Sequence, residues 1–123
     1  MSELLHLEIT KEIIGAAIEV WKVLGYGFLE KVYENATAEE VNRRGLVSKK
    51  QVSIEVSYKG VTVGLYVADL LVEGSVIVEF KAENELNLKH QAQMINYLKA
   101  TGIRVGLLVN FGERKCEWKR LVV

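Results

Sequence analysis

Apolar residues recur every three or four positions in three segments of the chain, and this spacing predicts three amphipathic helices. The first is expected over residues 9–24 and should end at Gly25, because two glycines within three residues disfavour a helix. The second is expected from about residue 28 to Arg44, since Gly45 suits a left-handed C-cap. The third should span residues 88–101, with an apolar stripe made of Leu88, Ala92, Ile95 and Leu98.

Between the second and third helices the pattern changes to an alternation of apolar and polar residues, which predicts β-strands. Residues 51–58 and 61–67 flank the tight turn Lys59-Gly60 and should pair with Val56 opposite Val63. Residues 105–109 are wholly apolar, as in a strand buried on both faces, and residues 116–123 can form a last strand. We expect helices to cover the apolar face of the hairpin, which would consist of Val52, Ile54, Val56, Val61, Val63, Leu65 and Val67.

Length and composition fit one globular domain over residues 1–123, because half of the residues are apolar and 26% are charged. The formal net charge is zero, which argues against a large phosphate-binding surface but is compatible with a local basic patch. The single cysteine, Cys116, cannot form an internal disulfide. The sequence shows neither a signal-peptide pattern nor an apolar run long enough to cross a bilayer, so we expect a cytoplasmic protein without membrane contact.

The segment with the most chemical content is a second hairpin, residues 67–81, whose apolar strands carry Asp69, Glu79 and Lys81. If its loop comprises residues 73–75, Asp69 lies directly opposite Glu79, and Lys81 shares their face. Two opposed carboxylates repel each other, and a divalent cation with oxygen ligands would remove that repulsion. This hairpin therefore indicates a candidate metal site on the helical side of the sheet.

Two alternatives remain open for this hairpin. A two-residue turn at Gly74-Ser75 would pair Leu70 with Glu79 and move Asp69 to the opposite face. Even with the longer loop, Lys81 could simply form an ion pair with one carboxylate at a solvated sheet edge.

The helices carry further polar candidates. Glu30 and Glu34 lie one turn apart on the second helix, where they form either a solvated face or part of a cation site. Gln93 and Tyr97 lie one turn apart on a stripe next to the apolar stripe of the third helix. His90 begins the same side, and a partly exposed position explains it without a metal.

These motifs resemble the PD-(D/E)xK nuclease superfamily. The expected elements are two helices, three strands, a helix and one or two strands. This order resembles the restriction-endonuclease-like α/β (α+β) core of the superfamily, which is a central mixed sheet flanked by helices. Asp69 followed by Glu79-Phe80-Lys81 resembles its D…E-x-K element. Residues 27–33, GFLEKVY, match the motif G-x-x-E-x-x-Y, for which the small GxxExxY family of this superfamily is named. Residues 93–97, QMINY, resemble the Q-x-x-x-Y element of its exonuclease branches.

The resemblance implies a function and a set of roles. The chain would be a nuclease that hydrolyses phosphodiester bonds, of DNA in the first place, with Mg²⁺ or Mn²⁺ as cofactor. Its metal ligands would be Asp69, Glu79, the Phe80 carbonyl and Glu30, with Glu34 as the weaker alternative to Glu30. Lys81 would orient or help deprotonate the attacking water. Substrate contacts would come from Gln93, Tyr97 and Tyr33, the tyrosine of the G-x-x-E-x-x-Y motif.

Two departures from the superfamily bear on this expectation. Ala68 replaces the proline of the superfamily name, and the sequence shows little beyond the core and no basic excess. A homodimer would supply a longer groove and a second site. The alternative function is a catalytically silent module of the same fold that binds nucleic acid or a partner protein. Exposure of Lys31, Lys49, Lys50, Lys89 and Lys99 near the cleft would favour nucleic acid.

Overall fold

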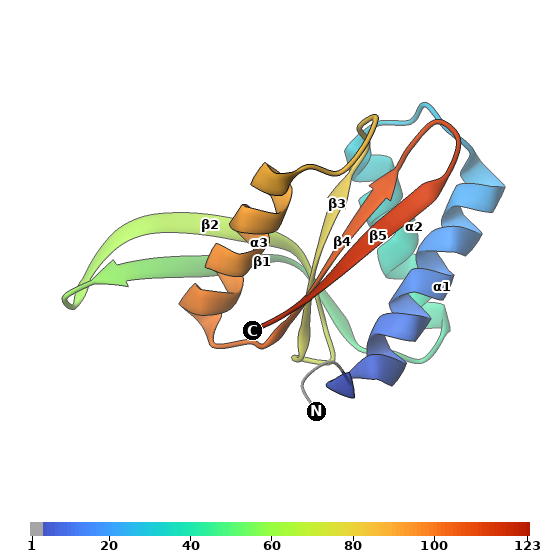
Figure 1. The fold of residues 1–123 in the computed structure, drawn as a ribbon. Coiled ribbons are helices and arrows are strands. Elements are labelled where there is room, and N and C mark those ends of the chain that lie inside the picture. The colour runs from blue at the N-terminus through green and yellow to red at the C-terminus, as the bar shows by residue number, and fades with distance from the viewer. Residues whose placement is uncertain (1–3) are drawn as a thin grey trace.

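A single five-stranded mixed sheet forms the centre of the protein (Figure 1), which a computed structural model describes for residues 4–123. The strands lie side by side in chain order, and only β3 and β4 run parallel. This confirms the predicted mixed sheet and the order of its elements. They are α1 (Leu7–Leu24), α2 (Glu30–Arg43), β1 (Ser48–Tyr58), β2 (Val61–Val72), β3 (Val76–Lys81), α3 (Leu88–Thr101), β4 (Val105–Phe111) and β5 (Cys116–Val122).

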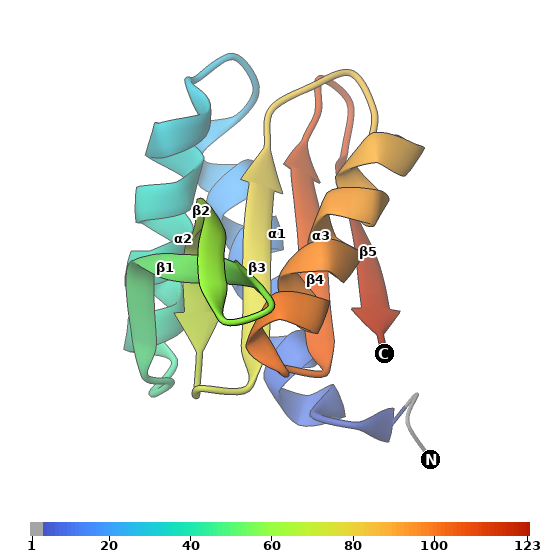
Figure 2. The same ribbon diagram turned by 90° about the vertical axis from the view of Figure 1, so that its left-hand side faces the viewer.

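Helices cover both faces of the sheet (Figure 2). On one face, α1 and α2 pack their buried side chains against the larger core, which includes Leu70, Val78 and Phe80. On the other face, α3 packs against a smaller core that includes Ile77 and Leu108. β4 is buried along its whole length, as predicted for a wholly apolar strand. No helix among residues 4–123 is long and apolar enough to cross a membrane.

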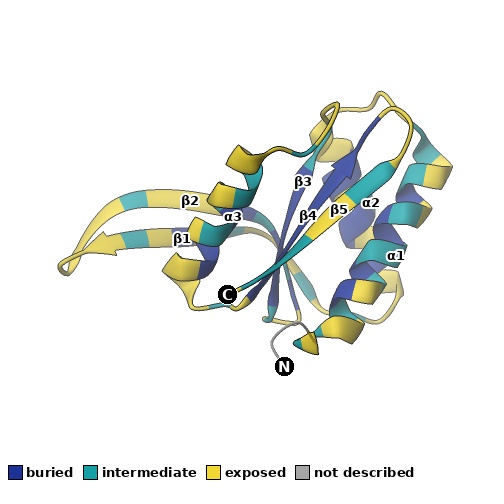
Figure 3. Cartoon of the chain, viewed as in Figure 1, coloured by how far each residue is buried: buried dark blue, intermediate teal, exposed yellow. Residues whose placement is uncertain are grey.

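The distal part of the first hairpin, residues 51–68, projects from the sheet as an arm (Figures 1 and 3). A register shift between Val56 and Ser57 places Val56 opposite Gly64, so the predicted pairing of Val56 with Val63 is wrong. The extra residue on β2 is a β-bulge, which reverses the faces of all the residues that follow. Ala68 is therefore buried towards α3. Of the residues expected to be covered, Ile54 is buried and Val52 and Val56 are half-buried. The four on β2 instead lie exposed; they are Val61, Val63, Leu65 and Val67.

The buried stripe of α3 also differs from the predicted one. Met94, Tyr97 and Leu98 face the sheet, whereas Leu88 is 79% exposed and Ala92 is exposed. The spacing of apolar residues predicts the helix correctly, but Tyr97, expected on the stripe beside the apolar one, is itself buried against the sheet. The physical reason is that the hairpin register brings Ile54 and Ala68 under this part of α3, where large side chains fill the space.

Candidate active site

The predicted site lies where β2 separates from β3. Their ladder consists of Leu70–Val78, Leu71–Ile77 and Val72–Val76, so the loop is residues 73–75, and the odd-length turn is confirmed. The ladder ends at Leu70, and the arm of β1 and β2 projects away from β3 (Figure 1). Asp69 and Glu79 are the first residues beyond the last ladder pair and so lie at the opening between the two strands.

Each of the two carboxylates accepts a hydrogen bond from a backbone amide of the other strand. Glu79 Oε2 accepts a hydrogen bond from the Asp69 amide at 2.9 Å, and Asp69 Oδ2 accepts one from the Phe80 amide, also at 2.9 Å. The side chains thus bind backbone donors at the level where β2 and β3 diverge. Both carboxylates are thereby held at the opening rather than in solvent.

Glu79 carries the strongest electrostatic perturbation of the site. Its side chain is buried, and this burial is the main reason why the pKa of Glu79 is raised to about 9. A hydrogen bond with the Asp69 side chain and repulsion by the Asp69 charge raise the pKa further. The charge of Lys81 acts in the opposite direction. The pair therefore favours binding of a proton or of another cation.

Lys81 follows two residues after Glu79 and is half-buried. None of the salt bridges among residues 4–123 involves Lys81. The alternative of a direct ion pair with Asp69 or Glu79 is therefore not the arrangement that the structure adopts. An ammonium group that lies near carboxylates but is not held in one of these salt bridges can bind an anion such as a phosphate.

Glu30, the first residue of α2, lies at the edge of this site. Partial burial raises the pKa of Glu30, while the nearby Lys81 lowers it and Asp69 raises it. In the described part of the chain no three His, Cys, Asp or Glu residues are already grouped as a metal site. Glu30 is thus close enough to interact electrostatically with the pair but does not complete a preformed cluster.

Glu34, the other candidate acid on α2, is buried and hydrogen-bonded. It is 3% exposed and accepts hydrogen bonds at 2.9 Å from both Lys31 Nζ and Gln51 Nε2. The alternative of a solvated position for Glu34 is therefore wrong, because α2 turns this residue towards the base of the arm. Gln51 anchors that base in a left-handed conformation with φ 56°.

Tyr33, the last residue of the G-x-x-E-x-x-Y motif, is completely buried. Its ring stacks on Phe111 with a centroid distance of 4.4 Å. Its hydroxyl donates to the Gly25 carbonyl and accepts from the Phe28 amide. With no exposed surface, Tyr33 does not fit the expected substrate contact. It instead fixes the loop between α1 and α2.

Gln93 and Tyr97 of α3 lie on the other side of the carboxylate pair. Burial raises the pKa of Tyr97 to about 12, and the charges of Glu79 and Asp69 add to this rise. A hydrogen bond with Gln93 acts in the opposite direction. The structure thus brings the Q-x-x-x-Y residues next to the D…E-x-K residues. The Phe80 ring lies in the larger core, so that only its backbone is available to the site.

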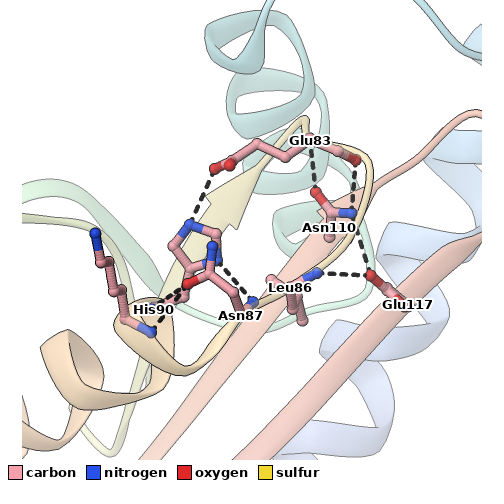
Figure 4. A network of polar contacts seen from close by, with 7 residues as sticks. Glu83, Leu86, Asn87, His90, Asn110 and Glu117 are labelled. Carbon is pink, nitrogen blue, oxygen red and sulfur yellow. Dashed lines mark hydrogen bonds and ion pairs between the residues drawn. The ribbon is translucent and has the colours of Figure 1, made fainter.

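A polar network fixes the connection that follows Lys81 (Figure 4). The buried Asn110 side chain accepts from the Glu83 amide and donates to the Glu83 carbonyl, both at 2.9 Å. Glu117 accepts from the Leu86 amide, and His90 lies 3.0 Å from the Glu83 carboxylate. His90 is therefore a structural residue, and the loop between β3 and α3 is held firmly beside the site.

Gln51 and Asn110 are site-supporting residues that the sequence reasoning missed. The run Ser48-Lys49-Lys50-Gln51 is the signal for Gln51, because four polar residues interrupt the alternation where β1 bends. Asn110 gives a weaker signal as the single polar residue within β4. All five lysines expected near the cleft, Lys31, Lys49, Lys50, Lys89 and Lys99, are exposed.

The donor chemistry of the site fits a hard divalent cation. Two carboxylates are adjacent, and Glu79 binds its proton unusually tightly, so a cation would relieve an existing electrostatic penalty. Carboxylate and carbonyl oxygens are the ligands that Mg²⁺ and Mn²⁺ prefer.

Comparison with known proteins gave matches at the level of family and fold. The family model described as "PD-(D/E)XK nuclease superfamily" matches residues 7–121. An alkaline exonuclease from Laribacter hongkongensis, LHK-Exo, superposes with a TM-score of 0.55 and 15% identity, over 87% of this chain and 66% of the exonuclease. SSO0001 gives a TM-score of 0.52 and 13% identity, over 93% of this chain and 77% of that one. These likenesses show the restriction-endonuclease-like fold. No curated protein matched the sequence.

Proposed function

This chain belongs to the PD-(D/E)XK nuclease superfamily, and we propose that it is a metal-dependent nuclease that hydrolyses phosphodiester bonds of DNA. The observation that carries the proposal is the carboxylate pair of Asp69 and Glu79 at the opening between β2 and β3, with Lys81 beside it. Within the superfamily we assign the chain to the GxxExxY family on the motif of residues 27–33.

In this proposal Asp69 and Glu79 hold a divalent cation, Mg²⁺ or Mn²⁺, with the Phe80 carbonyl and Glu30 as further ligands. When bound, such a cation would lower the pKa of a water molecule and would neutralise negative charge that develops on the phosphate. Lys81, as an ammonium group, orients that water and stabilises the negative charge on the phosphate, and the proton of the water passes to solvent. Water oxygen forms a new bond to phosphorus, the bond to the leaving oxygen breaks, and that oxygen takes up a proton. Gln93 and Tyr97 contact the substrate beside the pair.

Cleavage assays test this function directly. Fluorescent single-stranded DNA, duplex DNA and RNA are incubated with the protein in Mg²⁺, in Mn²⁺ and in EDTA. We expect cleavage of DNA that EDTA abolishes. Lys81→Ala should lower kcat by about 10²- to 10³-fold, the usual cost of losing one preorganised group that stabilises charge in the transition state. Lys119→Ala, which removes an exposed lysine from β5, is the matched control and should cleave normally.

A second function has a specific observation in its favour. The reciprocal hydrogen bonds give Asp69 and Glu79 a role in joining β2 to β3 that needs no catalysis. A silent nucleic-acid-binding module would retain these contacts. Absence of cleavage with every metal and nucleic acid, combined with unchanged nucleic-acid binding on adding metal, would support this alternative and contradict the nuclease.

We also propose that two copies of the chain associate. The exposed apolar side chains of the arm, among them Val63 and Leu65, support this, because contiguous exposed apolar surface is typical of protein contacts. Light scattering after size-exclusion chromatography should give the mass of a dimer. A double substitution, Val63→Ser with Leu65→Ser, should return the mass to that of one chain.

A further inference from the structure

A groove of about 780 Å³ separates α3 from the arm. On the helix side its lining includes Lys89, Gln93, Asn96 and Lys99. The spacing of the first three residues places them along one line of the helix, with Lys99 on the flank. This line lies beside the buried stripe of α3, and with Ala92 and Ala100 it forms a wall that carries two lysines and two amide side chains.

The opposite wall is formed by the arm and contains one aromatic side chain, Tyr66 of β2. The bulge in the hairpin turns Tyr66 to the same strand face as Ile54 and Ala68, which is the face towards α3. Tyr66 is 48% exposed, so about half of its surface remains open to a ligand.

Tyr97 connects the groove to the carboxylate pair. It lines the groove, and its ring centroid is 5.7 Å from that of Tyr66. On its other side it lies close enough to Glu79 and Asp69 for their charges to act on its phenol group. A ligand stacked on Tyr66 would therefore lie one aromatic ring away from the proposed reaction centre.

We propose that this groove binds a single, unpaired strand of nucleic acid, with one base stacked on Tyr66 and the phosphates beside Lys89 and Lys99. The inference rests on the proposed function and names the substrate class of the same site. An unpaired base offers its aromatic face to a side chain, whereas the bases of a duplex stack on one another. A basic groove combined with an aromatic platform is the arrangement that binds single strands without sequence preference.

Glu55 also lines the groove and opposes phosphate binding. Lys89 and Lys99 outnumber it, so the lining has a positive excess. Glu55→Gln should therefore strengthen binding of a strand. Lys99→Gln should weaken it and reduce the slope of log affinity against log salt by about one.

The test measures binding apart from cleavage. Fluorescein-labelled oligothymidylate and a duplex of the same length are titrated with Asp69→Asn protein in EDTA, and fluorescence anisotropy gives Kd. We expect the single strand to bind more tightly than the duplex. Tyr66→Ala should weaken single-strand binding by about 10-fold, as expected for loss of one stacked base. Tyr66→Phe should preserve binding.

Tyr58→Ala is the matched control, because Tyr58 is another exposed tyrosine of the arm, 62% exposed, that does not line the groove. Equal effects of Tyr66→Ala and Tyr58→Ala, or tighter binding of the duplex, would overturn the groove proposal. Normal DNA cleavage by Tyr66→Ala protein would overturn it while leaving the nuclease intact. Tyr66-dependent binding without any cleavage by the wild type would retain the groove and reject the nuclease.

Discussion

At the scale of single residues, the environment of Glu79 determines how the site responds to pH. Its buried carboxyl group binds a proton more tightly in the folded chain, where its pKa is raised from the ordinary value of 4.5, than in the unfolded chain. Stability falls with rising pH wherever the folded state binds more protons. This group therefore contributes most below about pH 4.5, and its contribution declines as the pH rises towards the folded pKa.

We predict that, in EDTA, the free energy of unfolding of the wild type falls between pH 5 and pH 9 more steeply than that of Glu79→Gln. The amide of glutamine keeps the size of the side chain and an oxygen acceptor for the Asp69 amide but cannot be charged. Urea unfolding at a series of pH values measures this. Parallel pH profiles for the two proteins would show that the pKa of Glu79 is not raised in the folded chain.

The sequence sufficed to predict Asp69, Glu79 and Lys81 as neighbours, because strand alternation and loop length determine which side chains face one another. It did not suffice for Glu34 and Tyr33. Their burial depends on how α2 rotates onto the sheet, and glutamate at that position is compatible with either a solvated or a buried face.

At the scale of elements, the N-terminus of α3 depends on one capping residue. The Asn87 side chain accepts from the amides of Lys89 and His90, and His90 accepts from the Asn87 amide. Asn87→Ala should lower the free energy of unfolding by about 1 kcal/mol, the usual cost of losing an N-cap. Asn84→Ala, an exposed residue of the same connection, should change it by less than about 0.5 kcal/mol. Urea unfolding of both variants tests this, and equal losses would contradict the role of the cap.

The contact between β4 and α3 leaves no room for a side chain at Gly106. A Cβ atom there would lie 2.4 Å from Met94 Sδ and 2.7 Å from Met94 Cγ. Because Met94 is fully buried, we predict that Gly106→Ala destabilises the protein by about 1–3 kcal/mol. Gly64→Ala is the control, since its Cβ would have its nearest contact at 3.6 Å. Thermal unfolding measures both, and an unchanged Tm of Gly106→Ala would mean that Met94 finds another rotamer without cost.

The order of helices and strands followed from residue periodicity, but the register of the first hairpin did not. A single extra residue near Val63 reverses the faces of the arm, and the alternation of apolar residues continues through the bulge without a visible break. The same pattern therefore predicted a buried face where the structure has an exposed one. Face assignments on α3 failed for a related reason, because they depend on what the hairpin presents to that helix.

At the scale of the whole molecule, a cation that binds between β2 and β3 should stabilise the fold. A ligand that binds only the folded state at one hundred times its Kd adds about 2.7 kcal/mol. We predict that saturating Mg²⁺ or Mn²⁺ raises the Tm and that Asp69→Asn removes this response. Glu39→Gln, which alters an exposed salt bridge on α2, should respond like the wild type. The same shift in Asp69→Asn and in wild-type protein would locate the cation elsewhere.

The reciprocal hydrogen bonds between β2 and β3 also limit what the presence of the acidic motif in a sequence indicates about catalysis. Asp69 and Glu79 hold backbone amides together whether or not a reaction takes place. A descendant of this chain that lost its chemistry would still be selected for an oxygen acceptor at both positions, simply to keep its sheet intact. Persistence of the acidic pair across a lineage would then record the demands of folding as well as those of catalysis. Lys81, whose side chain forms no salt bridge with any of residues 4–123, is the more informative marker of retained activity.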